Sequence, residues 1–302
     1  MTTNTPLPPE ALTEQVRAHY AETALRVQNG QSCCGPACCG TTEDVVTGNL
    51  YDADQVAELP EDAVLASLGC GNPTALIALH AGETVLDLGS GGGIDVLLSA
   101  RRVGPTGFAF GVDMTDEMLA LALANKAQAQ ATNVAFLRGR IEDIPLPNSS
   151  VDVVISNCVI NLASDKGQVL REAFRVLKPG GRFAVSDVVA DGPVPDALRH
   201  NMEAWVGCLA GALVMDDYTQ LLQEAGFAEV SIEITRRYTV AEAGLDVGTL
   251  PDGWEAGDGK LASAFVRATK PLTTSEPARR AVPVALAATN SDECCGADCC
   301  AS

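Results

Sequence analysis

Apolar positions recur along the chain with two different periods, which predict alternating strands and helices. Buried strands are predicted by short apolar runs at residues 84–88, 108–112, 134–137, 151–155 and 182–189. Helices are predicted by apolar positions at helical spacing in residues 94–102, 116–131 and 166–177. Strands that alternate with amphipathic helices form βαβ units, so the pattern predicts an α/β fold with a doubly wound, mainly parallel sheet.

Further elements are expected on both sides of this alternating region. A helix is predicted over residues 7–29, because one apolar stripe runs along it: Leu12, Val16, Tyr20, Ala24 and Val27. Residues 216–225 predict another helix that stops at Gly226. Residues 230–234 and 263–268 then predict two late strands, an antiparallel hairpin with a long connection, which complete a seven-stranded sheet.

The composition of the chain divides it into four segments. Residues 1–66 hold the N-terminal helix and a cysteine-rich loop, and residues 67–189 hold the ligand-binding core of the sheet. Residues 190–270 are expected to add a helical cap and the last strands. Residues 271–302 are rich in Ala, Pro, Thr and Ser, which predicts a disordered tail, and they end in a paired-cysteine cluster that repeats the pattern of the N-terminal loop.

Charge and cysteine content narrow the possible functions. A formal net charge of −19 argues against a nucleic-acid groove and against docking on an anionic membrane. The sequence has no apolar run long enough to span a bilayer and no visible secretory signal, so a cytoplasmic location is expected. Because the cytosol keeps thiols reduced, the 11 cysteines suggest soft-metal or redox chemistry rather than a disulfide framework.

A glycine-rich turn follows the first predicted strand and indicates a cofactor site. Gly89 and Gly91 let the backbone approach a ligand at the start of the next helix. A dinucleotide fingerprint would need a third glycine, where Ile94 stands, and Asp87 would repel a pyrophosphate. Asp87 suits a ligand with an ammonium and a sulfonium, and Asp113, at the end of the second strand, can accept hydrogen bonds from ribose hydroxyls. The turn therefore favours S-adenosylmethionine over NAD.

The loop after the third predicted strand lies where the adenine of such a cofactor is expected. Ile141 would pack against the ring, and Glu142 or a backbone group would meet the exocyclic amine. The alternative is an ordinary solvated loop in which Glu142 and Asp143 have no ligand.

The order of these segments resembles the class I methyltransferase fold, and within it the arsenite methyltransferases. The motifs that carry the resemblance are GCGNP, VLDLGSGGGID, GVDM, RIEDIP, VISNCVINL, REAFRVLKPGG, SDVV and VGCLAGAL, from about Tyr20 to about Lys270. The glycine turn and LKPGG occur in many methyltransferases. The specific motifs are NCVIN at 157–161, GCLAG at 207–211 and the Gly-Cys-Gly around Cys70.

The resemblance implies an arsenic site built from cysteine thiolates. It implies that Cys158 and Cys208 hold the arsenic, while Cys70 and an N-terminal cysteine, either Cys33 or Cys34, join them or leave as an oxidised pair. Arsenite or its thiol conjugates would be the substrate, and thioredoxin or glutathione would reduce the enzyme. The cofactor residues are then expected to be Asp87, Gly89, Ser90, Gly91, Asp113, Met114, Ile141, Glu142 and Asn157.

The sequence departs from the animal relatives at two places. It has four cysteines in the N-terminal loop, at 33, 34, 38 and 39, and it has Ser67 and Leu68 where two aromatic residues are expected. Any aromatic lining from positions 67 and 68 is therefore absent. The paired cysteines lack the spacing of a zinc site and suggest flexible thiol clusters, and the C-terminal cluster either captures arsenic, shuttles electrons or has no role in turnover.

The chemistry is consistent with these residue types. Trivalent arsenic is soft and pyramidal and takes up to three thiolates, which leave its lone pair free to attack the donor methyl. Placing both reactants in near-attack geometry is then the main task of the protein, and no general acid or base is needed. Two alternatives remain: a methyltransferase of an organic small molecule with structural cysteines, and a non-catalytic, thiol-rich protein that sequesters metalloids.

Overall fold

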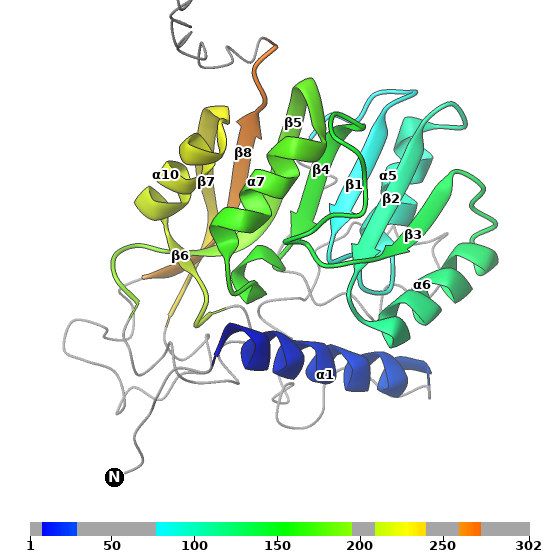
Figure 1. The fold of residues 1–302 in the computed structure, drawn as a ribbon, viewed down its shortest axis with the longest axis horizontal. Helices are drawn as coiled ribbons and strands as arrows, with labels where there is room; N and C mark the ends of the chain where they lie inside the picture. Colours follow the sequence, from blue (N-terminus) through cyan, green and yellow to red (C-terminus); the bar gives the residue numbers. More distant parts are fainter. Residues whose placement is uncertain (1–7, 29–76, 195–208, 240–259, 273–302) are drawn as a thin grey trace, which may run out of the picture. The chain divides into compact units, whose positions relative to one another are not determined.

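A computed structural model describes residues 8–28, 77–194, 209–239 and 260–272 of the chain. Within them, one eight-stranded sheet has the order β3-β2-β1-β4-β5-β8-β7, with the short β6 beside β5 (Figure 1). The first five strands are parallel, and β8 and β7 form the antiparallel end of the sheet. The predicted doubly wound, mainly parallel α/β fold is confirmed.

The predicted elements are found close to their expected bounds. The strands are β1 Thr84–Leu88, β2 Phe108–Asp113, β3 Val134–Arg138, β4 Val151–Asn157, β5 Leu177–Ala190, β6 Leu213–Val214, β7 Ala228–Tyr238 and β8 Leu261–Thr269. The helices are α1 Pro9–Gln28, α5 Ile94–Val103, α6 Asp116–Gln128, the 3-10 turn η1 Ile160–Leu162, α7 Lys166–Val176 and α10 Met215–Ala225.

Successive side chains of the strand β1 pack into two different hydrophobic clusters, one on each face of the sheet. Leu86 and Leu88 of β1 belong to the large cluster that includes the buried faces of α7 and α10. Val85 points to the other face and packs with Val103 of α5. Because successive strand residues point to opposite faces, a strand covered by helices on both sides has to be apolar throughout. This explains why the parallel strands were detectable as short, continuous apolar runs.

Two predictions about strands need correction. β5 begins at Leu177 rather than at residue 182, because Leu177 pairs with Val151 before a register irregularity at the Pro-Gly-Gly turn. The sheet also has an eighth strand, since β6 runs parallel to the end of β5 through the pair Val189 and Leu213. A two-residue strand has too few positions to show a hydrophobic period, so the sequence pattern could not reveal it.

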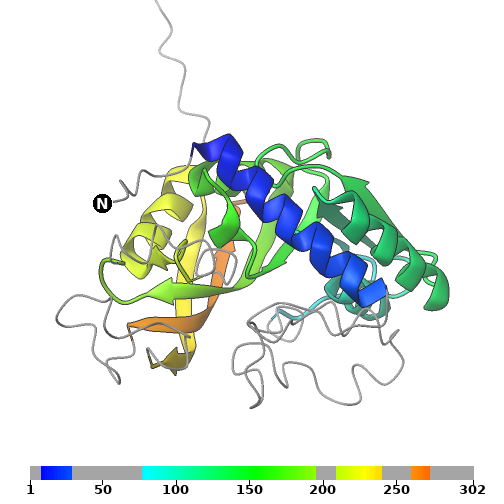
Figure 2. The same cartoon turned by 90° about the horizontal axis from the view of Figure 1, so that it is seen from below.

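Helix α1 crosses the ends of the strands, close to where the parallel strands finish (Figure 2). Its predicted stripe faces inward, with Val16, Ala24 and Val27 at most 2% exposed, and Val27 packs against Leu121 of α6. Among the described residues, no helix is both long and apolar enough to cross a membrane.

Several predictions concern residues outside the described ranges. These are the cysteine-rich loop, most of the proposed cap (195–208) and the C-terminal tail (273–302). The described end of the cap region, at β6, is extended rather than helical.

Candidate active site

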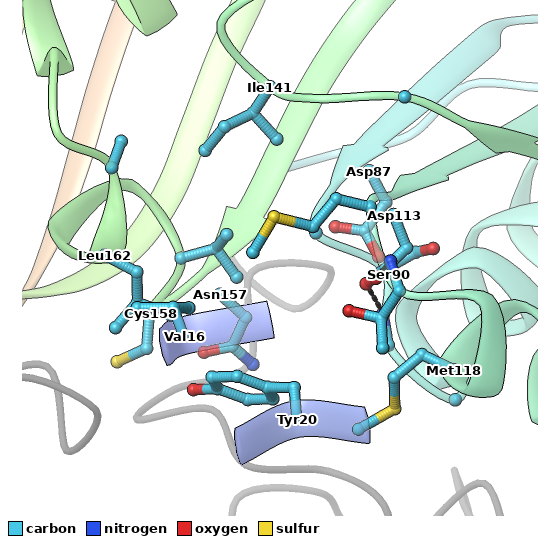
Figure 3. Close-up of a pocket in the computed structure, with 18 of the residues that line it drawn as sticks. Val16, Tyr20, Asp87, Ser90, Asp113, Met118, Ile141, Asn157, Cys158 and Leu162 are labelled. Atoms are coloured by element: carbon cyan, nitrogen blue, oxygen red, sulfur yellow. Dashed lines mark hydrogen bonds between the residues drawn. The ribbon is translucent and has the colours of Figure 1, made fainter. Parts of the chain in front are cut away.

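One pocket opens where β1, β2 and β4 end, and α1 closes one side of it (Figure 3). Its lining includes every residue that the sequence predicted for the cofactor: Asp87, Gly89, Ser90, Gly91, Asp113, Met114, Ile141, Glu142 and Asn157. These residues come from four separate stretches of the chain. Parallel strands end at one edge of a sheet, and ligands of open α/β folds bind in the crevice outside that edge.

The glycine turn between β1 and α5 has a backbone that other residues would strain. Gly89, Gly91 and Gly93 all have positive φ angles, of 69°, 49° and 87°. The amide of Gly89 donates a hydrogen bond to the Val112 carbonyl of the neighbouring strand at 2.8 Å. A Cβ atom on Gly89 would overlap the side chain of Val159, which leaves no room for alanine. The turn is therefore fixed in a form that exposes backbone to a ligand.

Asp113 ends β2 and is held in place by the turns around it. Its carboxylate accepts hydrogen bonds from the amide of Gly91 at 3.0 Å and from the amide of Thr115 at 2.8 Å. Burial raises the pKa of Asp113, and these backbone hydrogen bonds partly oppose that shift by favouring the charged form. The side chain lines the pocket, as expected for a group that accepts from ribose hydroxyls.

Three carboxyl groups meet on one side of the pocket. Asp87 is 3% exposed, and its pKa is raised well above the usual value by burial and then by the nearby charges of Asp95 and Asp113. Like charges enclosed this closely are unfavourable unless a cation joins them. An ammonium and a sulfonium would supply that charge, whereas a pyrophosphate would be repelled. The three carboxyl groups thus fit S-adenosylmethionine as the ligand.

Asp95 is a pocket residue that the sequence reasoning did not select. It lies in the first turn of α5, is 4% exposed, and accepts a hydrogen bond at 3.4 Å from the Nδ2 of Asn157. Its position two residues after the glycine turn was a possible sign of a pocket residue. However, acidic residues are common in the first turn of a helix, where they interact favourably with the helix dipole, so the position alone does not indicate a site. Its burial, which the sequence does not show, distinguishes it from an ordinary exposed acid.

The loop after β3 is anchored rather than freely solvated. Glu142 forms an ion pair with Arg140 at 3.4 Å, and the carbonyl of Glu142 accepts a hydrogen bond from Gln168 of α7 at 3.1 Å. Ile141, in the same loop, packs against the main core and also lines the pocket. These contacts give the loop a defined position beside the place expected for adenine.

Helix α1 forms a wall of the pocket that the sequence did not predict. Thr13, Val16 and Tyr20 all line it, and Figure 3 shows the Tyr20 ring close to Asn157, with its hydroxyl on the side of Cys158. The sequence pattern predicts Tyr20 only as one member of an apolar stripe. An aromatic ring therefore reaches the pocket from α1.

Cys158 lies at the far side of the same pocket, directly after β4. Its backbone has a positive φ of 59°, which is unusual for a residue with a side chain, and its amide donates to the carbonyl of Ser186 at 2.8 Å. The side chain is 4% exposed, and its sulfur is disulfide-bonded in this structure. Cys158 is the only cysteine within the described residues, so Cys33, Cys34, Cys70 and Cys208 lie outside them.

Comparisons with known proteins agree with this site. A family model described as a methyltransferase domain matches residues 79–226. An arsenite methyltransferase of Halobacterium salinarum is 44% identical over 278 residues, which cover 87% of this chain and 68% of that protein. An arsenite methyltransferase of Aquipseudomonas alcaligenes is 36% identical, with 88% and 74% covered.

A comparison with solved structures also finds an arsenic methyltransferase. The crystal structure of an arsenic (III) S-adenosylmethionine methyltransferase from Chlamydomonas reinhardtii is 33% identical, with a TM-score of 0.59 and 72% of each chain covered. The strand order, the glycine turn and the carboxylate-lined pocket define a class I S-adenosylmethionine-dependent methyltransferase. Within that class, the chain belongs to the arsenite methyltransferase family.

Proposed function

We propose that this chain is an arsenite methyltransferase that transfers methyl groups from S-adenosylmethionine to As(III) held by cysteine thiolates, and so detoxifies arsenic. The observation that carries the proposal is that Cys158 and the residues fitted to the methyl donor line one pocket. A donor site and a thiol within one cavity allow direct transfer between the two bound reactants. Sequestration of a metalloid would not require a donor site at all.

Each group of pocket residues has a separate task. Asp113 would accept hydrogen bonds from the ribose hydroxyls, while Asp87 and Asp95 would balance the positive charges of the donor. Ile141 would pack against the adenine ring beside Glu142, with Ser90, Met114 and Asn157 completing the lining. Bound S-adenosylmethionine supplies an already activated methyl group, so the chain needs no acid or base for the transfer.

The cysteines would hold arsenic with its lone pair toward the donor. Cys158 already lies in the pocket, and the segment that begins at Leu209, just after Cys208, packs in the same apolar cluster as Cys158. This placement supports Cys208 as a second ligand. Cys70 is proposed as the third from the resemblance to the family. Holding the arsenic and the methyl donor in one orientation lowers the entropy cost of the reaction.

A thiol reductant is part of the proposal. Cys158 has to be a thiolate to bind arsenic, and a disulfide-bonded sulfur cannot do so. Methylation would leave the arsenic formally pentavalent, and Cys70 with Cys33 or Cys34 would supply the two electrons that return it to As(III) by closing a disulfide. Exchange with thioredoxin or glutathione would reduce that disulfide and would also release Cys158. Because arsenite binding favours deprotonation of the thiols, reduction and binding together would prepare the site near neutral pH.

The test is a product assay on the reduced full-length chain. Arsenite, S-adenosylmethionine and a thiol reductant are incubated with the chain, and the arsenic species are separated by chromatography. We expect methylated arsenic from the unsubstituted chain and none from Cys158→Ser or Cys208→Ser. Full methylation by either variant would overturn the thiolate mechanism. No methylated arsenic from the unsubstituted chain, although S-adenosylmethionine binds to it, would instead favour a methyltransferase of an organic small molecule.

A further inference from the structure

A buried polar contact lies directly behind the loop that carries Cys158. Asn161, in η1, is completely buried, and its Nδ2 donates to Asp187 Oδ1 and to the carbonyl of Val188, both at 2.7 Å. Asp187 Oδ1 also accepts from the Val188 amide at 3.0 Å. The side chain of Asn161 therefore connects the loop at residues 158–161, called the Cys158 loop below, to the end of β5 by hydrogen bonds.

The main chain of Asn161 faces a second segment. A Cβ atom on Gly211 would overlap the carbonyl of Asn161, so only glycine allows the two backbones to approach this closely. Gly211 lies three residues after Cys208, and the intervening Leu209 and Ala210 pack in one apolar cluster with Cys158. Asn161 thus makes two contacts: its side chain holds the Cys158 loop against β5, and its main chain lies against the segment that follows Cys208.

The carboxyl group in this contact is costly for the fold. Asp187 is 1% exposed, and burial raises its pKa to about 7, partly opposed by hydrogen bonds from its surroundings and by the charge of Lys166 of α7. The hydroxyl of Tyr218, from α10, faces the same carboxyl group, and the tyrosine pKa is raised first by burial and then by the charge of Asp187. Buried ionisable groups usually lower stability relative to apolar residues, so a gain in stability does not explain Asp187 at this position.

We propose that the Asn161–Asp187 pair, with Gly211 against it, is the positioning contact that sets the Cys158 loop and the segment after Cys208 at the distance needed to share one arsenic atom. This rests on the proposed function. Neither Asn161 nor Asp187 lines the donor pocket, so the pair acts on arsenic coordination and not on the cofactor. Loss of the pair would leave Cys158 and Cys208 in the chain but allow the Cys158 loop to separate from the segment that begins at Leu209.

The test measures arsenic coordination and donor binding separately on the reduced full-length chain. Arsenite and S-adenosylmethionine affinities are measured by calorimetry, and the number of sulfur atoms bound to arsenic by X-ray absorption. Asp187→Ala removes the acceptor, so we expect arsenite affinity to fall about tenfold or more, with fewer sulfur ligands, while donor affinity stays within about threefold. Asp187→Asn keeps an acceptor oxygen for Asn161 and should restore arsenite affinity to within about threefold.

A control variant separates positioning from general loss of stability. Asn133 donates its amide to three carbonyls, of Ala100, Gly104 and Gly107, near the opposite ends of the strands. Asn133→Ser should lower stability without changing the number of sulfur atoms on arsenic. If Asp187→Ala does not fold, Gly211→Ala carries the test, because its Cβ would push the same segment away from the Asn161 carbonyl while both side chains of the polar pair remain.

The outcomes distinguish this inference from the proposed function. Unchanged arsenite affinity and sulfur number in Asp187→Ala, or in Gly211→Ala if that variant carries the test, would overturn the positioning role alone. So would equal changes in Asp187→Ala and Asn133→Ser. Failure of the unsubstituted reduced chain to bind arsenite would overturn the proposed function and this inference with it.

Discussion

The donor side and the arsenic side of the pocket are built in different ways. Donor residues come from the ends of neighbouring strands: Asp87 is the second-last residue of β1, Asp113 is the last residue of β2, and Ile141 lies in the loop after β3. The proposed arsenic ligands come from segments far apart in the sequence, at Cys70, Cys158 and Cys208, and Cys158, which is the one of them within the described residues, directly follows β4. The sheet fixes the first group, whereas packing between loops has to fix the second.

This difference predicts that the two sides fail separately. Substitutions on the arsenic side should abolish methylation while leaving donor binding intact. Substitutions on the donor side should weaken the cofactor while leaving arsenite bound. A substitution that weakens both ligands equally would indicate that the two sides are coupled through the fold.

The largest effect is expected from Cys158→Ser. A hydroxyl is a poor ligand for a soft centre, so turnover should fall by about a hundredfold or more, while donor affinity stays within about threefold. Steady-state kinetics and calorimetry measure the two quantities. Cys300→Ser, in the tail, is the matched cysteine control and should retain turnover. Retained methylation in Cys158→Ser would contradict the assignment of Cys158 as an arsenic ligand.

Asp113→Ala should have the largest effect on the donor side. The variant loses a carboxylate that is proposed to accept from the ribose, and it also releases the amides of Gly91 and Thr115. A charged hydrogen bond contributes about 1.5–3 kcal/mol, so donor affinity should fall about 10- to 100-fold with arsenite affinity unchanged. The control is Asp116→Ala, whose carboxylate is 63% exposed three residues further on. Unchanged donor affinity would contradict the assignment of Asp113.

Tyr20→Ala tests whether α1 belongs to the donor side. Removing the ring opens the wall of the pocket, and the KM for the donor should rise about three- to tenfold. Tyr20→Phe should keep most of the affinity if the ring rather than the hydroxyl makes the contact. Leu25→Ala, on the same helix and 47% exposed, provides the control. Equal values for Tyr20→Ala and Leu25→Ala would show that α1 only packs against the core.

Asp187→Asn should have the smallest effect on methylation and a distinct effect on stability. Since the folded pKa of Asp187 is raised from 3.8 to about 7, its favourable contribution to stability is complete below about pH 4 and is lost as the pH rises to about 7. The asparagine removes this loss, which is at most about 4 kcal/mol at ~1.4 kcal/mol per pKa unit. Denaturant unfolding from pH 5 to 8 measures the difference. Asp191→Asn, whose carboxylate is 51% exposed, should show the pH dependence of the unsubstituted chain.

Sequence reasoning reached the donor side more completely than the arsenic side. The period of the strands located Asp87 and Asp113 at strand ends, and parallel strands place their ends together. Burial is a property of the folded chain. The sequence therefore predicts Asp95 only as an acidic residue at a helix start and Tyr20 only as a core residue, and not as residues that line the pocket. The contact between Gly211 and Asn161 joins residues 50 positions apart (211 − 161), and no local pattern reports such a contact. The cysteine roles came from resemblance to a family and not from spacing.

The central claim is that one pocket holds arsenic on thiolates while it receives the donor methyl. A single-turnover experiment tests this most directly. The reduced chain is loaded with one equivalent of arsenite, freed of excess, and mixed with S-adenosylmethionine that carries a labelled methyl group. We predict that labelled methylarsenic and S-adenosylhomocysteine form in equal amounts from the preformed arsenic complex. Formation of S-adenosylhomocysteine without label on arsenic, or no transfer from the preformed complex, would contradict the claim.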